Sequence, residues 1–253
     1  MPRGTLSLSG NTAAIPIFSP PYTNTTHKFS DISIAAISYR VSHASVQHLI
    51  PDVLELEAEP LVTTLFVKYG MSTVGSYNEF VHQVEVTYEG EKYNYSLVLV
   101  LDNEAAIFAG REAFGFPKVF GRTEIRESTG GRSIVGHVER PVGERIVDFE
   151  FLPEELLKGG GGSKPQQAPK RRTLNLRVVP SADPAKPPAV KEFVPVYMDM
   201  EFKDVWVGKG NVSFLKKSAI NPWANVDILR YEGASYATGG TAVLENPTEA
   251  FPL

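Results

Sequence analysis

One lysine of this chain stands in a setting that suits nucleophilic chemistry. Residues 101–121 read LDNEAAIFAGREAFGFPKVFG, so Lys118 follows Pro117 directly and has Phe116 and Phe120 close by in the sequence. An exposed lysine amine has a pKa of about 10.4 and is protonated at neutral pH, whereas burial among apolar groups disfavours the charged form and lowers that pKa. The pattern is therefore compatible with a neutral amine at Lys118 that attacks a carbonyl carbon and forms an imine.

The same residues have a purely structural interpretation. A strand that enters a sheet after a proline can also read Lys-Val-Phe, with the lysine stem on apolar surface and its charged head in water. Lysine is seldom fully buried, so the pattern taken alone favours this interpretation. The residues by themselves leave both possibilities open.

Further motifs bring the chain close to a known family. The segment 101–121 resembles the signature segment of the acetoacetate decarboxylase family in its LDNE start, its Gly110-Arg111-Glu112 triplet and its Pro117-Lys118 pair. Supporting matches are Tyr39-Arg40, Glu59-Pro60-Leu61-Val62, Tyr77-Asn78-Glu79, and a tail with Trp206, Gly208, Pro222 and residues 231–236. The resemblance covers most of the chain except the first twenty or so residues and an insertion near residue 160. It implies that Lys118 is the Schiff-base lysine.

The chain also departs from that family pattern. Acetoacetate decarboxylases carry two adjacent lysines after the proline, and here the second position is Val119. Ile32 and Leu65 stand where the resemblance leads us to expect an arginine and a glutamate, so only Glu79 and Lys118 remain of the polar set. We therefore expect a substrate that is larger or more apolar than acetoacetate.

The resemblance implies a mechanism in which Lys118 attacks a ketone or an oxo acid and the resulting iminium withdraws electrons from the adjacent carbon. Glu79 is the candidate that moves protons, and Tyr77 is the candidate that orients the substrate. Glu79 has an alternative interpretation as a solvated turn residue, because residues 75–78 have turn composition. Arg111 and Glu112 are expected to form a structural pair that closes the helix before Lys118.

Three functions follow from these residues. The leading one is a Schiff-base lyase, similar to a decarboxylase, that acts on a ketone or a 2-oxo or 3-oxo acid through Lys118. The second is a Schiff-base aldolase-dehydratase or cyclase that acts on a pyruvate-like or natural-product substrate. The third is a non-catalytic barrel that binds an apolar small molecule, in which Lys118 stays protonated.

Composition limits the remaining possibilities. The chain has 253 residues, 42% of them hydrophobic, which is enough for one substantial core, so we expect a single domain over residues 1–253. A net charge of -4 gives no reason to expect nucleic acid as a partner. There are no cysteines, and the five histidines lack HExxH spacing, so neither a metal nor a cofactor is expected. Without a run of 18 apolar residues we expect no membrane span and a cytoplasmic protein, and the resemblance implies a homo-oligomer.

Hydrophobic periodicity predicts a mainly β protein with a few short helices. Strands are expected at 32–39 and 61–69, in a hairpin of 80–88 and 93–101 that turns at Glu89-Gly90, and at 123–126, 133–140, 144–151, 174–179, 193–207 and 233–244. Pro195 is a candidate break in the strand at 193–207. Helices are expected at 42–50, capped by Ser42, and at 103–113, capped by Asp102 or Asn103 and ended by Gly115. Residues 158–172, KGGGGSKPQQAPKRR, have almost nothing apolar and are expected to form a flexible insertion. The resemblance sharpens the fold to the family's antiparallel conical β-barrel, with the lysine inside.

Overall fold

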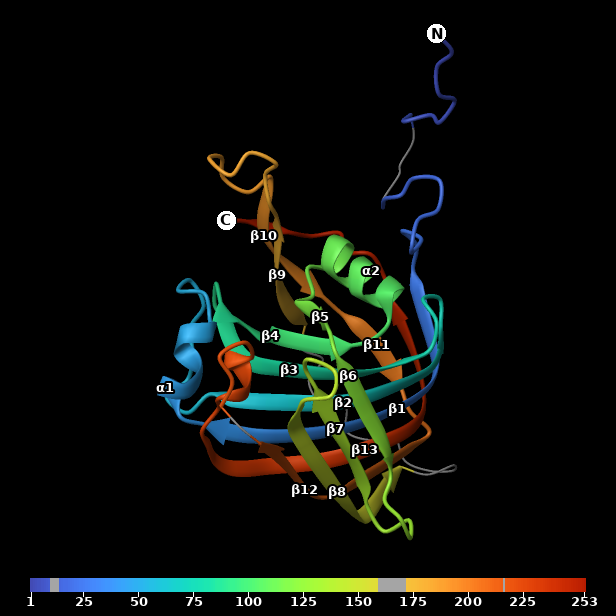
Figure 1. The fold of residues 1–253 in the computed structure, drawn as a ribbon. Coiled ribbons are helices and arrows are strands. Elements are labelled where there is room, and N and C mark those ends of the chain that lie inside the picture. Colours follow the sequence, from blue (N-terminus) through green and yellow to red (C-terminus); the bar gives the residue numbers. More distant parts are fainter. Residues whose placement is uncertain (10–13, 159–171, 216) are drawn as a thin grey trace.

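The computed structural model describes residues 1–9, 14–158, 172–215 and 217–253, and it is dominated by strands (Figure 1). The strands are β1 (His27–Val41), β2 (Leu61–Ser72), β3 (Tyr77–Tyr88), β4 (Glu91–Leu101), β5 (Lys118–Phe120), β6 (Arg122–Glu127), β7 (Ile134–Glu139), β8 (Arg145–Lys158), β9 (Thr173–Val179), β10 (Val190–Val196), β11 (Met198–Glu201), β12 (Asp204–Phe214), β13 (Ile228–Leu244) and β14 (Phe251–Pro252). The helices are α1 (His43–Val46) and α2 (Glu104–Phe114), with short 3₁₀ turns at Gln47–Leu49 and Pro222–Ala224. The predicted mainly β class with few helices is confirmed.

Within the described residues the strands form one large mixed sheet. Its hydrogen-bonded order is β14-β10-β9-β4-β3-β2-β1-β13-β12-β8-β7-β6, with β5 added to β4 and β11 added to β13. Most pairs are antiparallel, as predicted, but β4 pairs in parallel with both β5 and β9. A parallel pair needs a crossover connection, and α2 provides it between β4 and β5.

The sheet curls back on itself, so that the strands β6 and β7 cross in front of β2 and β3 (Figure 1). Two hydrogen bonds tie β6 to the strands behind it. The Asn78 side-chain amide donates to the Thr123 carbonyl oxygen at 3.2 Å, and the Thr123 hydroxyl donates to the Val100 carbonyl oxygen at 2.9 Å. The edge strands of the sheet are β14 and β6. The two side-chain contacts hold β6 against the curled sheet, but β6 and β14 are not paired with each other by backbone hydrogen bonds.

The curled sheet encloses two apolar clusters. The first cluster includes Phe66, Phe80, Phe149, Phe151 and Trp223. The second cluster lies towards α2 and includes Phe29, Tyr69, Tyr77, Leu101 and Phe114. Side chains alternate between the two faces of a strand, so β3 supplies Phe80 to the first cluster and Tyr77 to the second. Many residues of the second cluster line the cavity described below.

Local signals place the elements around this cluster. The hairpin between β3 and β4 turns at Glu89 and Gly90, whose φ values are 49° and 81°, the left-handed region that a tight hairpin requires. Helix α2 begins where the Asn103 side chain accepts a hydrogen bond from the Ala106 amide at 2.8 Å, and it ends at Gly115, whose φ is 69°. The predicted hairpin and helix are confirmed.

Two predictions need correction, and a third concerns residues outside the described ranges. The helix at 42–50 is a single α-helical turn followed by a 3₁₀ turn, and Ser42 makes no capping bond with its side chain. The strand predicted at 193–207 is divided among β10, β11 and β12, because the chain leaves β9 after Val196 to pair Met198 with Leu244 of β13, and Pro195 lies inside β10. The predicted flexibility of residues 158–172 falls almost wholly outside the described residues.

No helix that the structure describes has the length and apolar character needed to cross a membrane.

Candidate active site

Lys118 is the first residue of β5 and lies just beyond the end of α2. Its side chain enters the second apolar cluster, and the residue is only 7% exposed. The Lys118 carbonyl oxygen accepts a hydrogen bond from Arg111 Nη1 at 3.0 Å, which ties the last turns of α2 to the start of β5. A lysine buried inside the fold contradicts the structural interpretation, in which the amine would reach water.

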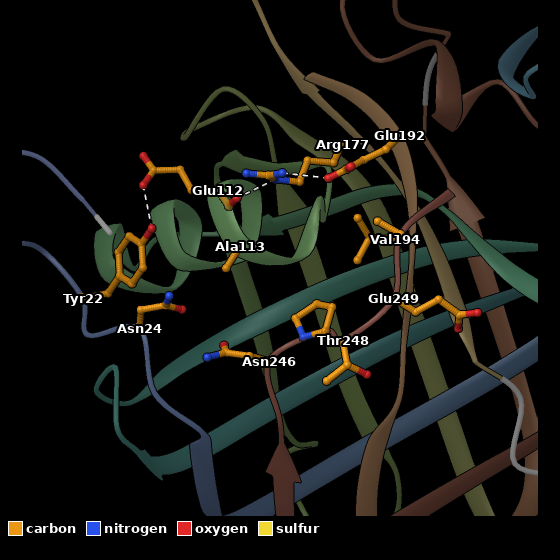
Figure 2. Close-up of a pocket in the computed structure, with 12 residues that line it drawn as sticks. Tyr22, Asn24, Glu112, Ala113, Arg177, Glu192, Val194, Asn246, Thr248 and Glu249 are labelled. Carbon is orange, nitrogen blue, oxygen red and sulfur yellow. Dashed lines mark hydrogen bonds and ion pairs between the residues drawn. The ribbon is translucent and has the colours of Figure 1, made fainter. Parts of the chain in front are cut away.

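Gly110 and Glu112, the other two residues of the Gly110-Arg111-Glu112 triplet, contact different parts of the fold. Gly110 faces the aliphatic stem of Lys118, and Glu112 accepts a hydrogen bond from the Tyr22 hydroxyl at 2.7 Å. Arg177 of β9 donates to the Glu112 carbonyl oxygen at 2.7 Å and forms an ion pair with Glu192 (Figure 2). The expected pair of Arg111 with Glu112 is therefore replaced by contacts of each residue with a different part of the fold.

The carboxylate nearest to Lys118 belongs to Glu79. Glu79 Oε1 lies 2.9 Å from Lys118 Nζ, and Glu79 is 3% exposed. The Tyr69 hydroxyl donates a long hydrogen bond of 3.4 Å to the other carboxylate oxygen. Oε1 makes no well-aligned hydrogen bond to any described residue, the close ammonium included. Because Glu79 lies inside β3 and is buried, its interpretation as a solvated turn residue is wrong.

Two aromatic rings flank the amine. The ring centroids of Tyr77 and Phe116 each lie 5.6 Å from Lys118 Nζ, within the range of a cation–π contact. Burial, followed by the nearby negative charge of Glu79, raises the pKa of the Tyr77 and Tyr69 phenols well above 10, so both remain neutral hydroxyl groups. Burial and then the positive charge of Lys118 lower the pKa of His27, so this imidazole is neutral at physiological pH.

A cavity of about 130 Å³ opens in front of the Lys118 amine. Its walls come from β1, β2, β3, β4, β9, β11 and β13 together with the segment around Lys118. They are formed by Phe29, Ile34, Leu65, Val67, Tyr69, Tyr77, Glu79, Val81, Gln83, Leu99, Phe116, Lys118, Thr173, Met198, Met200 and Leu244. Lys118 and Glu79 are the charged residues among these. A wider hollow of about 470 Å³ lies between α2, β9, β10 and residues 246–250, and it is lined by Tyr22, Arg177 and Glu192 among others (Figure 2). We place the reactive site in the smaller cavity because the buried amine and carboxylate meet there.

Sequence reasoning had selected Lys118, Glu79 and Tyr77, and the structure brings these three together. It missed Tyr69, Gln83, Thr173 and the two methionines of β11. Strand periodicity could have indicated Gln83, because every second residue of β3 from Tyr77 to Gln83 lines the cavity. Among the described residues no group of three histidine, aspartate or glutamate side chains could hold a metal ion.

Comparison with known proteins identifies the family to which the chain belongs. A family model described as acetoacetate decarboxylase (ADC) matches residues 14–248. The chain belongs to the acetoacetate decarboxylase family. Decarboxylase DEC1 of Cochliobolus heterostrophus is 40% identical over 229 residues, covering 89% of each chain, and an acetoacetate decarboxylase of Chromobacterium violaceum is 27% identical over 88% of each. These relatives support an enzyme of the decarboxylase type, a carbon–carbon lyase.

Solved structures of the acetoacetate decarboxylase family have the same fold. One acetoacetate decarboxylase structure superposes with a TM-score of 0.82 over 96% of each chain, at 22% identity. The enduracididine biosynthesis enzyme MppR, solved with the condensation product of pyruvate and imidazole 4-carboxaldehyde, superposes with a TM-score of 0.77 over 99% of each chain, at 17% identity. At these identities the likeness concerns the fold.

The residues that depart from the pattern expected of an acetoacetate decarboxylase have three different positions. Leu65 lines the cavity, and Ile32 is fully buried in the second cluster beside it. Val119 packs against the first cluster instead, on the opposite face of β5 from Lys118. Replacement of the second lysine by Val119 therefore removes no group from the cavity of this protein.

Proposed function

We propose that this protein is a Schiff-base-forming decarboxylase that acts on a keto acid larger or more apolar than acetoacetate. The observation that carries the proposal is the contact between Lys118 Nζ and Glu79 Oε1, 2.9 Å apart in a cavity whose other walls are mostly apolar. A buried amine with a carboxylate beside it has both the nucleophile and the proton acceptor that imine formation requires.

The first step is attack of the Lys118 amine on the ketone carbon. The attacking amine must be neutral, and Glu79 Oε1 is close enough to take up the ammonium proton. A new carbon–nitrogen bond forms, and the carbonyl oxygen leaves as water after it receives protons. The product is an iminium ion that joins the substrate to Lys118.

The iminium then serves as the electron sink for bond cleavage. In a 3-oxo acid the carboxylate is attached to the carbon next to the iminium carbon. The bond between that carbon and the carboxylate breaks, carbon dioxide leaves, and the electron pair of the bond forms an enamine. A proton, supplied by Glu79 in this proposal, is added to the α-carbon, and hydrolysis of the new iminium releases a ketone and the free amine. The iminium formed on Lys118 is the only electron sink that this reaction requires, so the reaction needs no cofactor.

The apolar walls support both steps. Leu65, Val67, Val81 and Leu99 limit the water near Nζ, which protects the imine from early hydrolysis. A carboxylate beside these walls is poorly solvated, whereas carbon dioxide is neutral, so the surroundings favour loss of the charge. Tyr77, with its ring over the amine, is the residue that we assign to substrate orientation.

The test is borohydride reduction of the protein with a panel of ketones and keto acids, followed by mass mapping of the adduct. We expect an adduct on Lys118 in the unmodified protein and none in Lys118→Met. A Lys118→Met protein that keeps full turnover would refute the proposal. Product analysis decides the reaction type, because decarboxylation releases carbon dioxide whereas condensation of pyruvate with an aldehyde retains all its carbons.

A further inference from the structure

The cavity has a second polar end that the chemistry at Lys118 does not use. Gln83 lies on the cavity face of β3, four residues beyond Glu79, and is buried. Its side-chain amide donates a hydrogen bond of 3.3 Å to the hydroxyl of Thr173 in β9. Both residues line the cavity.

Strand geometry sets the distance between the two ends. A strand rises about 3.3 Å per residue, so Gln83 and Glu79 lie about 13 Å apart along β3. A short keto acid such as acetoacetate cannot contact both residues. The wall between them is apolar and includes Val81 of β3, Leu65 of β2 and Leu99 of β4.

The Gln83 side chain has hydrogen-bonding capacity that the described residues leave unused. A carboxamide side chain has two donor hydrogens and an acceptor oxygen, and the single long bond to Thr173 satisfies only one donor among the described residues. Because Gln83 lines the cavity, its second donor hydrogen and its acceptor oxygen are available to a ligand there. An oxygen-bearing group brought by the substrate would provide the remaining hydrogen bonds.

We propose that Gln83 and Thr173 recognise a neutral hydroxyl or keto oxygen near the far end of an elongated, otherwise apolar keto acid whose reacting carbonyl lies at Lys118. The inference rests on the proposed function and adds the class of substrate. We expect the recognised group of the substrate to be neutral. The Gln83 amide and the Thr173 hydroxyl offer hydrogen bonds, but neither carries a charge that could neutralise an ionic group.

The test compares two ligands that differ only at the far end. A straight-chain, medium-length methyl ketone and its ω-hydroxy analogue are each reduced with borohydride onto the intact protein, and adduct formation is measured against ketone concentration. We expect the unmodified protein to be half-saturated at a roughly 10-fold lower concentration of the hydroxy ketone, as expected for one buried hydrogen bond. Gln83→Leu and Thr173→Val should each remove most of this preference while the plain ketone still forms its adduct.

The control is Thr63→Val. Thr63 of β2 pairs in register with Gln83 but is not among the lining residues, and its hydroxyl contacts Ser38. We expect this variant to keep the preference for the hydroxy ketone. Equal half-saturation by both ketones in the unmodified protein, or an unchanged preference in Gln83→Leu, would overturn the inference and leave the imine intact. Failure of both ketones to react at Lys118 would instead refute the proposed function itself.

Discussion

Gly110 of α2 lies so close to Lys118 that the contact leaves no room for a side chain. A Cβ atom at Gly110 would be 2.5 Å from Lys118 Cδ and 2.6 Å from Cε, well inside normal contact distance. The helix backbone therefore forms one wall of the channel that holds the lysine stem, and the next residue, Arg111, holds the lysine backbone. The glycine and the arginine of the triplet together fix where the amine points.

Gly110→Ala is expected to impair chemistry while preserving the fold. The atoms that must move belong to the flexible lysine side chain, and alanine improves helix propensity by about 1 kcal/mol, which offsets part of the crowding. A displacement of about 1 Å at a reacting group can lower the rate roughly 100-fold, so we expect a loss of that order in imine formation. Rates of borohydride-trapped adduct formation and thermal denaturation midpoints provide the measurement.

Gly233→Ala is the matched control for that experiment. A Cβ at Gly233 meets no described atom within 4 Å, and its backbone is not in the left-handed region. This variant should retain both adduct formation and thermal stability. Full adduct formation in Gly110→Ala would show that the lysine stem can be repositioned without loss.

The buried pair of Glu79 and Lys118 makes a prediction about stability. Removal of one member of a buried ion pair leaves an uncompensated charge and typically costs about 3–5 kcal/mol, whereas replacement of both by apolar residues of similar size is often neutral. We expect Lys118→Met to be less stable than the unmodified protein, and Lys118→Met with Glu79→Leu to regain most of the loss. Denaturant midpoints at pH 7 measure this, and a double variant no more stable than Lys118→Met would contradict it.

Short-range signals explain what could be predicted from the sequence. Asn103 and Gly115 mark the ends of α2, and Glu89-Gly90 marks the hairpin turn, because each of these acts on backbone groups a few residues away. The same helix then requires that the next strand begin near Lys118. Thus the elements on either side of the lysine follow from local chemistry.

The cavity itself depends on contacts between distant parts of the chain. Met198 reaches the cavity because β11 pairs with the end of β13, and Thr173 reaches it because β9 pairs in parallel with β4. No local pattern encodes these pairings, so both residues were missed. The proximity of Glu79 to Lys118 came from the family resemblance, since the residues alone left Glu79 open to interpretation as part of a turn.

Val119 provides a test of how β5 is oriented. Val119 packs against the first apolar cluster while Lys118 faces the cavity, so a lysine at position 119 would not reach the amine. We expect Val119→Lys to form the same adduct on Lys118 with an unchanged pH profile, and to lower the free energy of unfolding by about 1–3 kcal/mol because a charge replaces a packed methyl group.

The control for this variant is Val119→Leu, which keeps an apolar side chain and should change stability by less than about 1.5 kcal/mol. If adduct formation in Val119→Lys moved to lower pH, the new ammonium would have to lie near Lys118. That result would contradict the packing of β5 described above.

His82 makes the fold sensitive to acid. It is fully buried in β3, its Nε2 lies 3.2 Å from the Tyr39 hydroxyl, and its Nδ1 has no hydrogen-bond partner among the described residues. Burial lowers the pKa of His82 from 6.5 to about 3. Between these two pH values the unfolded chain binds a proton that the folded protein does not, so the free energy of unfolding must fall as the pH is lowered through this range.

The prediction is a difference between two stability profiles. His82→Gln replaces the titrating ring with an amide that can still accept a hydrogen bond from Tyr39, and all carboxylates stay the same. Between pH 7 and pH 4.5 we expect the unmodified protein to lose about 2–3 kcal/mol more of its free energy of unfolding than His82→Gln loses. Urea unfolding across this range measures both profiles. Parallel profiles would mean that the folded protein accommodates a protonated His82, which its burial between Phe80, Phe214 and Trp223 argues against.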